Sequence, residues 1–193
     1  MDLIERIRAI MFSPAEAWRE IAREPAGPAI LLQAYVAALA AIPAAADFIG
    51  MTVIGYAVPG QGVVRVEVLP SFMAALFAYG MAFVITSFQA IVIYAIAPVY
   101  GARRDMTSSF KLAVYSFTPA WLAGIFLIVP GLHFLVILGL YGLYILYKGV
   151  TPLVLCPPQR AFMYAAVATA FGVMAALITG FVRARLFSLP GIL

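Results

Sequence analysis

One long stretch without charged residues determines the expected architecture. No Asp, Glu, Lys or Arg interrupts the 36 residues between Lys111 and Lys148. At about 1.5 Å of helix rise per residue, this stretch is far longer than one crossing of a hydrocarbon core of roughly 30 Å. It is expected to fold back at Pro130-Gly131, because Pro lacks a backbone N–H and Gly permits the dihedral angles of a tight turn. The pattern predicts two membrane spans joined as a helical hairpin.

Three further apolar runs predict three further spans. Most of the connections between the runs are short, so a single integral membrane domain is the simplest organisation. The predicted fold class is all-α, a polytopic membrane protein with five transmembrane helices preceded by short interfacial amphipathic helices. We expect an N-terminal cytoplasmic interfacial segment over residues 1–25 and a membrane domain over residues 26–193, with spans at about 29–54, 71–100, 107–129, 132–150 and 161–182.

The N-terminal segment is too charged to cross a membrane. Residues 2–12 place apolar side chains at helical spacing and charged side chains on the remaining surface, as in a short amphipathic helix. The sequence SPAE at 13–16 predicts a capping box that starts a second short helix. Two placements are open. The segment lies in the membrane interface with Phe12 and Trp18 dipped into it, or it packs as a cap on the cytoplasmic ends of the spans.

The connection between the first two spans is the only long one. Within residues 55–70, the sequence VVRVEV alternates apolar and charged side chains, as a strand does. A lone strand has no pairing partner there, so we expect a loop or a short interfacial segment.

Composition excludes a soluble globular protein. The chain is 65% hydrophobic and 10% charged, whereas soluble domains are roughly 45–50% apolar and about 25% charged. The net charge of +4 comes from Lys and Arg beside apolar runs, where they orient spans and contact anionic headgroups, so no nucleic-acid partner is expected. The first 24 residues carry five acidic and four basic side chains, so no cleavable signal peptide is expected. The single cysteine, Cys156, excludes an intrachain disulfide and is interpreted as apolar filler.

The distribution of basic residues predicts the orientation. Five spans place the two termini on opposite sides of the membrane, and cytoplasmic segments are enriched in Lys and Arg. With the N-terminus in the cytoplasm, nine of the 12 basic residues are inside and three are outside. The inside set is Arg6, Arg8, Arg19, Arg23, Arg103, Arg104, Lys111, Lys148 and Arg160, and the outside set is Arg65, Arg183 and Arg185.

Four polar residues within the spans form the candidate intramembrane site. Asp47 is the only acidic residue inside a predicted span. Such a group is normally paired, neutralised or functional, although Asp47 also lies near enough to the span end to extend to the interface. Ser87 and Gln89 lie in the middle of the second span, and Ser116 lies in the third. Polar groups of this kind usually form hydrogen bonds between helices, and lining a transport pathway is the alternative.

Two series of small residues predict close helix packing. Ala37, Ala41 and Ala45 recur at four-residue spacing in the first span, and Gly172, Ala176 and Gly180 do so in the fifth. Small side chains let helix backbones approach closely in lipid, where burial of apolar surface between helices gains little.

Proline within the third span predicts a specific backbone defect. Pro119 removes the hydrogen bond that would reach the carbonyl of Tyr115, one turn earlier. A neighbouring hydroxyl is expected to satisfy that carbonyl.

No motif in the sequence indicates catalysis. Paired carboxylates, a nucleophile with a base, a metal cluster and a phosphate-binding loop are all absent from the sequence. His133, the only histidine, has no Cys, Asp or Glu at ligand spacing and is interpreted as an interfacial aromatic residue. We therefore expect a protein that is not an enzyme and has no cofactor and no metal site.

The order of these parts resembles the Yip (Ypt-interacting protein) domain family, and in particular its prokaryotic branch. The resemblance rests on FSPAEAWREI near the start, on the run from SSFKLAVYSF to LYILYKGVTPL, and on the charged restart PPQRAFMYAA. It covers essentially the whole chain, and its motifs are packing motifs. The matching positions are Tyr115, Ser116, Pro119, Pro130, Tyr141, Tyr144, Gly149 and Pro152.

The resemblance implies a fold and a scaffold role in the membrane. Eukaryotic members are Golgi and ER membrane proteins that contact prenylated small GTPases and take part in vesicle traffic. In this chain, the long acidic cytosolic region before the first span is reduced to about 25 residues. The resemblance therefore does not extend to a small GTPase partner. The expected location is the bacterial plasma (inner) membrane.

Three functions are compatible with these features. The favoured one is a scaffold that associates laterally with itself or with other membrane proteins, and that organises or shapes the bilayer. The second is a small transporter or channel with a polar pathway near Asp47 and Gln89. The third is an accessory subunit of a larger membrane complex, which a partner copurifying at fixed ratio would identify.

Overall fold

Five membrane-length helical segments form one bundle. The computed structural model describes residues 2–25, 27–58 and 62–187, and the predicted boundary at residues 25/26 therefore falls next to a residue outside the described part. Each of the five segments is long and apolar enough to cross a bilayer, which confirms the predicted all-α polytopic fold. They cover Pro28–Ile54, Val68–Tyr100, Met106–Ile128, Pro130–Val154 and Pro158–Leu186.

The first two segments are continuous helices with local changes of pitch. The first begins as α3 (Pro28–Ile30), continues through π-helical η1 (Leu31–Val36) into α4 (Ala37–Ile49), and ends in π-helical η2 (Gly50–Ile54). Pro43 lies inside α4 and packs against Gly124 of the third segment. Only glycine permits this contact, because a Cβ at position 124 would lie 2.5 Å from the Pro43 side chain. The second is α5 (Val68–Ile96) followed by a 3-10 turn, η3 (Ala97–Tyr100).

The remaining segments differ strongly in regularity. The third consists of α6 (Met106–Ser116), α7 (Thr118–Ala123) and the 3-10 helix η4 (Gly124–Ile128). The predicted turn at Pro130 follows, and it starts a 3-10 helix, η5 (Pro130–Leu140), that continues into α8 (Tyr141–Val154). The fifth segment is a single helix, α9 (Pro158–Leu186).

The prediction for the break at Pro119 is confirmed. The chain changes from α6 to α7 immediately before this residue. The hydroxyl of Thr118 donates to the carbonyl oxygen of Tyr115 at 2.7 Å. The same hydroxyl is 2.9 Å from the hydroxyl of Tyr35 in η1, so the defect also connects the first and third segments.

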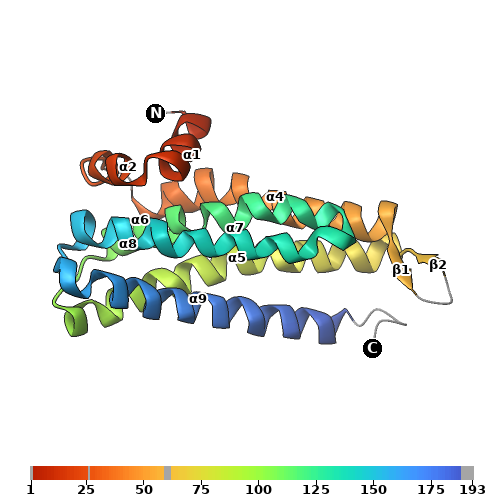
Figure 1. Ribbon diagram of the computed structural model, residues 1–193. Helices are drawn as coiled ribbons and strands as arrows, with labels where there is room; N and C mark the ends of the chain where they lie inside the picture. The colour runs from red at the N-terminus through yellow and green to blue at the C-terminus, as the bar shows by residue number, and fades with distance from the viewer. Residues whose placement is uncertain (1, 26, 59–61, 188–193) are drawn as a thin grey trace.

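The two ends of the bundle carry different structures (Figure 1). One end, here the cap end, bears α1 (Leu3–Phe12) and α2 (Pro14–Ile21) together with the α5–α6 and α8–α9 connections. The other, here the hairpin end, bears β1 (Tyr56–Val58), β2 (Gly62–Val64) and the turn at Pro130. The chain begins at the cap end, and α9 finishes at the hairpin end, as five spans require.

The long connection is not a plain loop, which corrects the sequence interpretation. Strand β2 pairs antiparallel with β1, with Tyr56 opposite Val64 and Ala57 opposite Val63. The partner strand comes from the start of the same connection, where only three residues are involved and no alternating pattern can be recognised.

The helix start at Ser13 also differs from the prediction. Its side chain forms no capping hydrogen bond, although Pro14 does occupy the first turn of α2. Ser13 is at the same time the C-terminal cap of α1, where its backbone N–H donates to the Ala9 carbonyl. The capping box is found one helix earlier, between Asp2 and Glu5.

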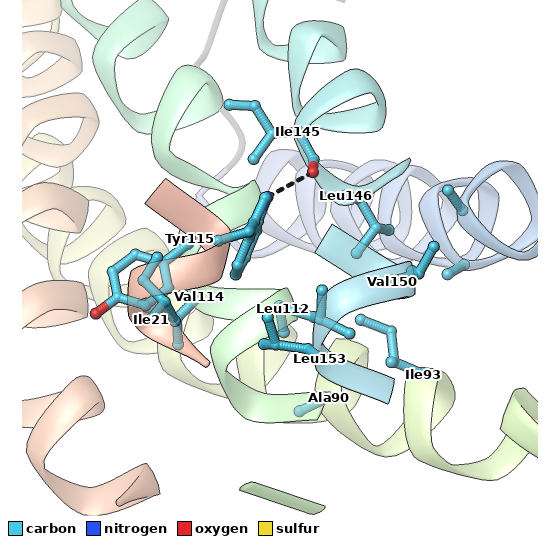
Figure 2. Close-up of a cluster of buried hydrophobic side chains, with 14 of the residues drawn as sticks. Ile21, Ala90, Ile93, Leu112, Val114, Tyr115, Ile145, Leu146, Val150 and Leu153 are labelled. Carbon is cyan, nitrogen blue, oxygen red and sulfur yellow. Dashed lines mark hydrogen bonds between the residues drawn. The ribbon is translucent and has the colours of Figure 1, made fainter. Parts of the chain in front are cut away.

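The largest cluster of buried apolar side chains lies toward the cap end (Figure 2). The main cluster of buried apolar residues draws only on residues 10–40, 90–121 and 145–168. Figure 2 shows side chains of α2, α5, α6 and α8 meeting in this cluster. It includes Ile21, Ile93, Leu112, Val114, Ile145, Leu146, Val150 and Leu153.

Candidate functional site

Trp18 anchors the N-terminal helices in the bundle instead of dipping into the lipid interface. Its side chain is 0% exposed, and its indole N–H donates to the carbonyl oxygen of Ile145 at 2.9 Å. Figure 2 shows this bond as a dashed line. The ring packs edge-on against Tyr115, with 5.9 Å between ring centroids. Of the two predicted placements, the structure supports the cap for Trp18, because a buried indole that finds a partner for its N–H is stable inside protein.

The site that receives Trp18 depends on a missing side chain. A Cβ at Gly149 of α8 would lie 2.6 Å from atoms of both Trp18 and Leu112. No larger residue fits at this position without moving the indole or the Leu112 side chain. Gly149 therefore serves to admit Trp18, whereas Phe12 is 84% exposed and is free to meet the interface as predicted.

Buried charges reinforce the same contact. The Arg6 guanidinium pairs with Glu24, lies 4.0 Å from a carboxylate oxygen of Glu20, and sits 5.9 Å from the Tyr115 ring centroid. The Lys111 ammonium donates to the backbone carbonyls of Ile21, at 2.9 Å, and of Glu24. Lys111 thus caps the C-terminal end of α2, where unpaired carbonyls and the helix dipole favour a cation.

One polar group of the candidate intramembrane set forms an ion pair. Asp47 of α4 is buried and pairs with the guanidinium of Arg183 in α9. Both residues lie toward the hairpin end of the bundle. A cavity of about 290 Å³ between α4, α5, α7 and α9 includes both residues and Thr86 in its lining. This pair ties the first span to the fifth.

Two other members of the set share a different cavity. Gln89 of α5 and Ser116 of α6 both line a space of about 430 Å³. The amide nitrogen of Gln89 donates to the carbonyl oxygen of Ala168 in α9 at 2.8 Å. The Gln89 amide oxygen and the Ser116 hydroxyl are buried without a hydrogen-bond partner in the described part of the chain. Gln89 therefore provides both an interhelical hydrogen bond, as predicted, and a polar atom that is not satisfied.

The four predicted polar residues do not converge on one site. Ser87 is half-buried and lines neither cavity. The two cavities adjoin, because Phe117, Ala120 and Ala176 line both. Those three residues are apolar, and neither Gln89 nor Ser116 lines the cavity that includes Asp47.

The two series of small residues have different environments. Ala41 and Ala45 are exposed, and Ala37 is half-buried, where its carbonyl accepts a hydrogen bond from the Tyr79 hydroxyl at 3.2 Å. In α9, Gly172 packs against Gln89 inside the bundle, since a Cβ there would lie 2.8 Å from the amide oxygen. Ala176 and Gly180 are exposed, and a Cβ at Gly180 would meet nothing within 4 Å.

His133, Tyr56 and Cys156 lie near the two ends of the bundle. At the hairpin end, His133 is half-buried, contacts the Leu127 carbonyl at 3.2 Å and packs edge-on against Tyr56. Burial raises the pKa of the Tyr56 hydroxyl, and Asp47 adds to the effect. At the cap end, burial raises the pKa of the Cys156 thiol, while Arg160 opposes the shift. This environment agrees with the interpretation of Cys156 as filler.

Comparison with known proteins identifies the family. The Yip1 domain matches residues 8–179, which is most of the chain. The chain belongs to the Yip1 domain family. No curated protein and no solved structure matches it significantly. Together with the five apolar helices, this membership establishes a multi-pass integral membrane protein.

Several positions that carry the Yip1 resemblance meet the N-terminal helices. Tyr115 contacts Trp18 and Arg6, and Gly149 admits the Trp18 ring. The hydroxyl of Tyr141 donates to the carbonyl oxygen of Met11 at 3.0 Å, and its ring stacks on Tyr144. These positions are packing positions, as the sequence indicated, and part of what they pack is the cap.

Sequence analysis did not identify the polar partners. Arg6 was predicted on the charged surface of the first helix, but it is buried and pairs with Glu24. Lys111 and Arg183 entered the prediction through their charge alone, yet each bonds a group about 90 or more residues away. One signal was present for Lys111, because it follows the charged loop by six residues and so enters a span. The partner of Asp47 had no local signal, since it lies 136 residues away.

Proposed function

We propose that this Yip1-family protein is a membrane scaffold that associates laterally through the hairpin-end half of α9. The observation that carries the proposal is the exposed face around Gly180. In the membrane-crossing window of α9, as in that of the α5 segment, 17% of the residues are buried, compared with 56% in the third segment. Leu177 and Phe181 are exposed beside Gly180, so a second helix can approach the α9 backbone closely at this point.

The partner is a second copy of this chain or another membrane protein. Purification from native membrane, in a polymer that retains the surrounding lipid, identifies which. A different protein at a fixed ratio makes the chain an accessory subunit, the third function considered from the sequence. Recovery of homo-oligomers supports self-association.

The test substitutes Gly180 by Leu. We expect the dimer population in liposomes, measured by energy transfer between labelled copies, to require about 10-fold more protein per lipid, which corresponds to about 1.4 kcal/mol. The matched control is Gly80→Leu in α5, where a Cβ also meets nothing within 4 Å. An unchanged association curve for Gly180→Leu would remove this face from the proposal. Gly172→Leu is unsuitable, because it collides with Gln89 inside the bundle.

The N-terminal helices supply the second part of the proposed role. Ile4 and Phe12 remain exposed although α1 and α2 are anchored by Trp18. We propose that these side chains enter the cytoplasmic leaflet and that the cap end faces the cytoplasm, since it carries nine of the 12 basic residues. Accessibility of single introduced cysteines in the two ends to an impermeant reagent tests this orientation.

A transport function is the second candidate, and the ion pair beside a cavity favours it. Asp47 and Arg183 line the cavity of about 290 Å³ and are the charged groups in its lining. If the pair gates a pathway, Asp47→Asn abolishes proton or ion flux in liposomes, while Ser87→Ala, outside both cavities, preserves it. Flux that is the same in Asp47→Asn and in the unsubstituted protein contradicts this candidate.

A further inference from the structure

The cavity beside Gln89 lies at the middle of the membrane span. Gly172, which contacts the Gln89 amide, is midway between Arg160 and Arg183, the charged residues near the two ends of α9. At about 1.5 Å per residue, it is roughly 17 Å from each. Water is scarce at that depth, so a polar atom there depends on protein or on a membrane-soluble molecule for hydrogen bonding.

The orientation of the Gln89 amide follows from its partner. The Ala168 carbonyl can only accept a hydrogen bond, so the amide nitrogen must face it. The amide oxygen is therefore the atom left without a partner, in a side chain that is 4% exposed. The oxygen packs against the backbone of Gly172, where a Cβ would lie 2.8 Å from it.

Ser116 places a second polar atom on the same cavity. Its hydroxyl is buried and also has no partner in the described part of the chain. A hydroxyl both donates and accepts, whereas the Gln89 oxygen only accepts. Gln89 is therefore suited to accept a hydrogen bond from a ligand hydroxyl, and Ser116 to donate or accept one.

The rest of the lining is apolar and uncharged. Among the described residues that line the cavity there is no Asp, Glu, Lys or Arg. Ile137 and Leu140 of η5 and Leu177 of α9 line it and are exposed on the outer surface of the bundle. The cavity thus opens sideways toward lipid, between η5 and α9.

One wall of the opening is an unusual helix. Runs of 3-10 helix longer than three or four residues are uncommon and often mark hinges. The 11 residues of η5 are entirely 3-10 in form, and none of them is buried. η5 packs on α7 and η4 and continues into α8, which packs on α9.

We propose that this cavity binds an uncharged lipid or lipid-like alcohol, whose hydroxyl donates to the Gln89 amide oxygen and whose apolar body lies between η5 and α9. A charged headgroup is disfavoured, because the lining offers no counter-charge at the membrane midplane. A plain acyl chain fills the space but leaves the amide oxygen without a donor. The volume of about 430 Å³ lies within the roughly 300–1,000 Å³ of small-molecule sites.

Photolabelling with a long-chain alcohol tests the proposal. The probe is 1-hexadecanol with a diazirine in its chain, added to the full-length protein in phosphatidylcholine nanodiscs. The competitors are 1-hexadecanol and its methyl ether, which has the same body but no donor. We expect labelling of η5 and α9, and competition by the alcohol at about 3- to 10-fold lower membrane fraction than by the ether, as for loss of one hydrogen bond.

Matched variants distinguish the contribution of the hydrogen bond to Gln89 from that of the cavity volume. Gln89→Leu abolishes the difference between alcohol and ether, while Ser87→Ala, on the same helix but outside the cavity, retains it. Ala176→Phe places a large side chain at an exposed residue of the lining, so it should reduce the total labelling. This variant tests the cavity if Gln89→Leu does not fold.

Three outcomes overturn the proposal. Equal competition by alcohol and ether shows a site for any apolar chain. Labelling outside η5 and α9 excludes the cavity as the binding site. Loss of labelling when copies associate, restored by Gly180→Leu, shows that a second copy occupies the opening. None of the supporting outcomes depends on the proposed scaffold function, so the two can fail separately.

Discussion

The cap half and the hairpin half of the bundle are held together by different physical means. The cap half contains most of the main buried cluster, together with the Trp18 anchor. The hairpin half contains both the unburied η5 and the cavity with its single described ion pair, between Asp47 and Arg183. In lipid, helices gain stability mainly from close packing and internal hydrogen bonds. We therefore expect the cap half to be the more stable part of the bundle.

The strongest test of this difference is Trp18→Ala. Removal of a fully buried indole should lower the free energy of unfolding by about 4 kcal/mol, measured by reversible unfolding in mixed detergent micelles. The matched control is Phe12→Ala, which should change it by less than about 0.5 kcal/mol because Phe12 is 84% exposed. Equal effects of the two substitutions would place Trp18 in lipid and contradict the cap.

The second test breaks the ion pair of the hairpin half. Asp47→Ala should lower the free energy of unfolding by about 3 kcal/mol, because it leaves the Arg183 charge without its partner at a partly buried position. The double variant Asp47→Asn with Arg183→Gln should recover most of the loss, since no charge remains. If the double variant is as unstable as the single one, the pair is not what holds α9 to α4.

The third test releases the cap without removing an aromatic ring. Lys111→Met leaves the carbonyls of Ile21 and Glu24 without their donor, which should cost about 2 kcal/mol. We expect faster hydrogen exchange in α2 and little change in α9. Lys148→Met is the control, because the described partners of Lys148 are the ring faces of Tyr144 and Tyr147. This substitution should lower the free energy of unfolding by less than about 1 kcal/mol. Uniformly faster exchange throughout the bundle would show that the cap is not a separate unit.

The smallest expected effect concerns Cys156 at the cap end. Burial raises the pKa of its thiol, so less thiolate is present at neutral pH than in the unfolded chain. Alkylation should be slower in the folded protein at pH 7 and should accelerate as the pH rises. The associated stability is fully present below the ordinary thiol pKa and is lost as the pH rises through the raised value. Equal rates in folded and unfolded protein would indicate that the α8–α9 connection is open.

The sequence predicted most helices and their breaks correctly, but it predicted few of the contacts between elements. The turn at Pro130 and the carbonyl defect at Tyr115 were predicted correctly, because Pro acts on its own backbone wherever the chain lies. Trp18 was assigned to two possible surroundings, because an amphipathic helix has the same pattern against lipid as against protein. The strand partner at Tyr56 was missed because three residues carry no periodic signal.

The same division holds for the candidate site. The sequence identified Asp47, Gln89 and Ser116 as unusual, since polar groups stand out in apolar spans. It could not show that Asp47 meets Arg183, or that the other two share a cavity that excludes Asp47. Those facts depend on which helix faces which.

Local chemistry therefore predicted the membrane as solvent, the five spans and their turns. Hydrophobicity, proline geometry and the distribution of charge act within a few residues, so the sequence alone is enough to predict these features. Tertiary structure alone decided that Trp18 is a core residue and that the Gln89 oxygen has no described partner. These depend on helix rotation and pairing, which small packing energies select among many similar arrangements of equally apolar surfaces.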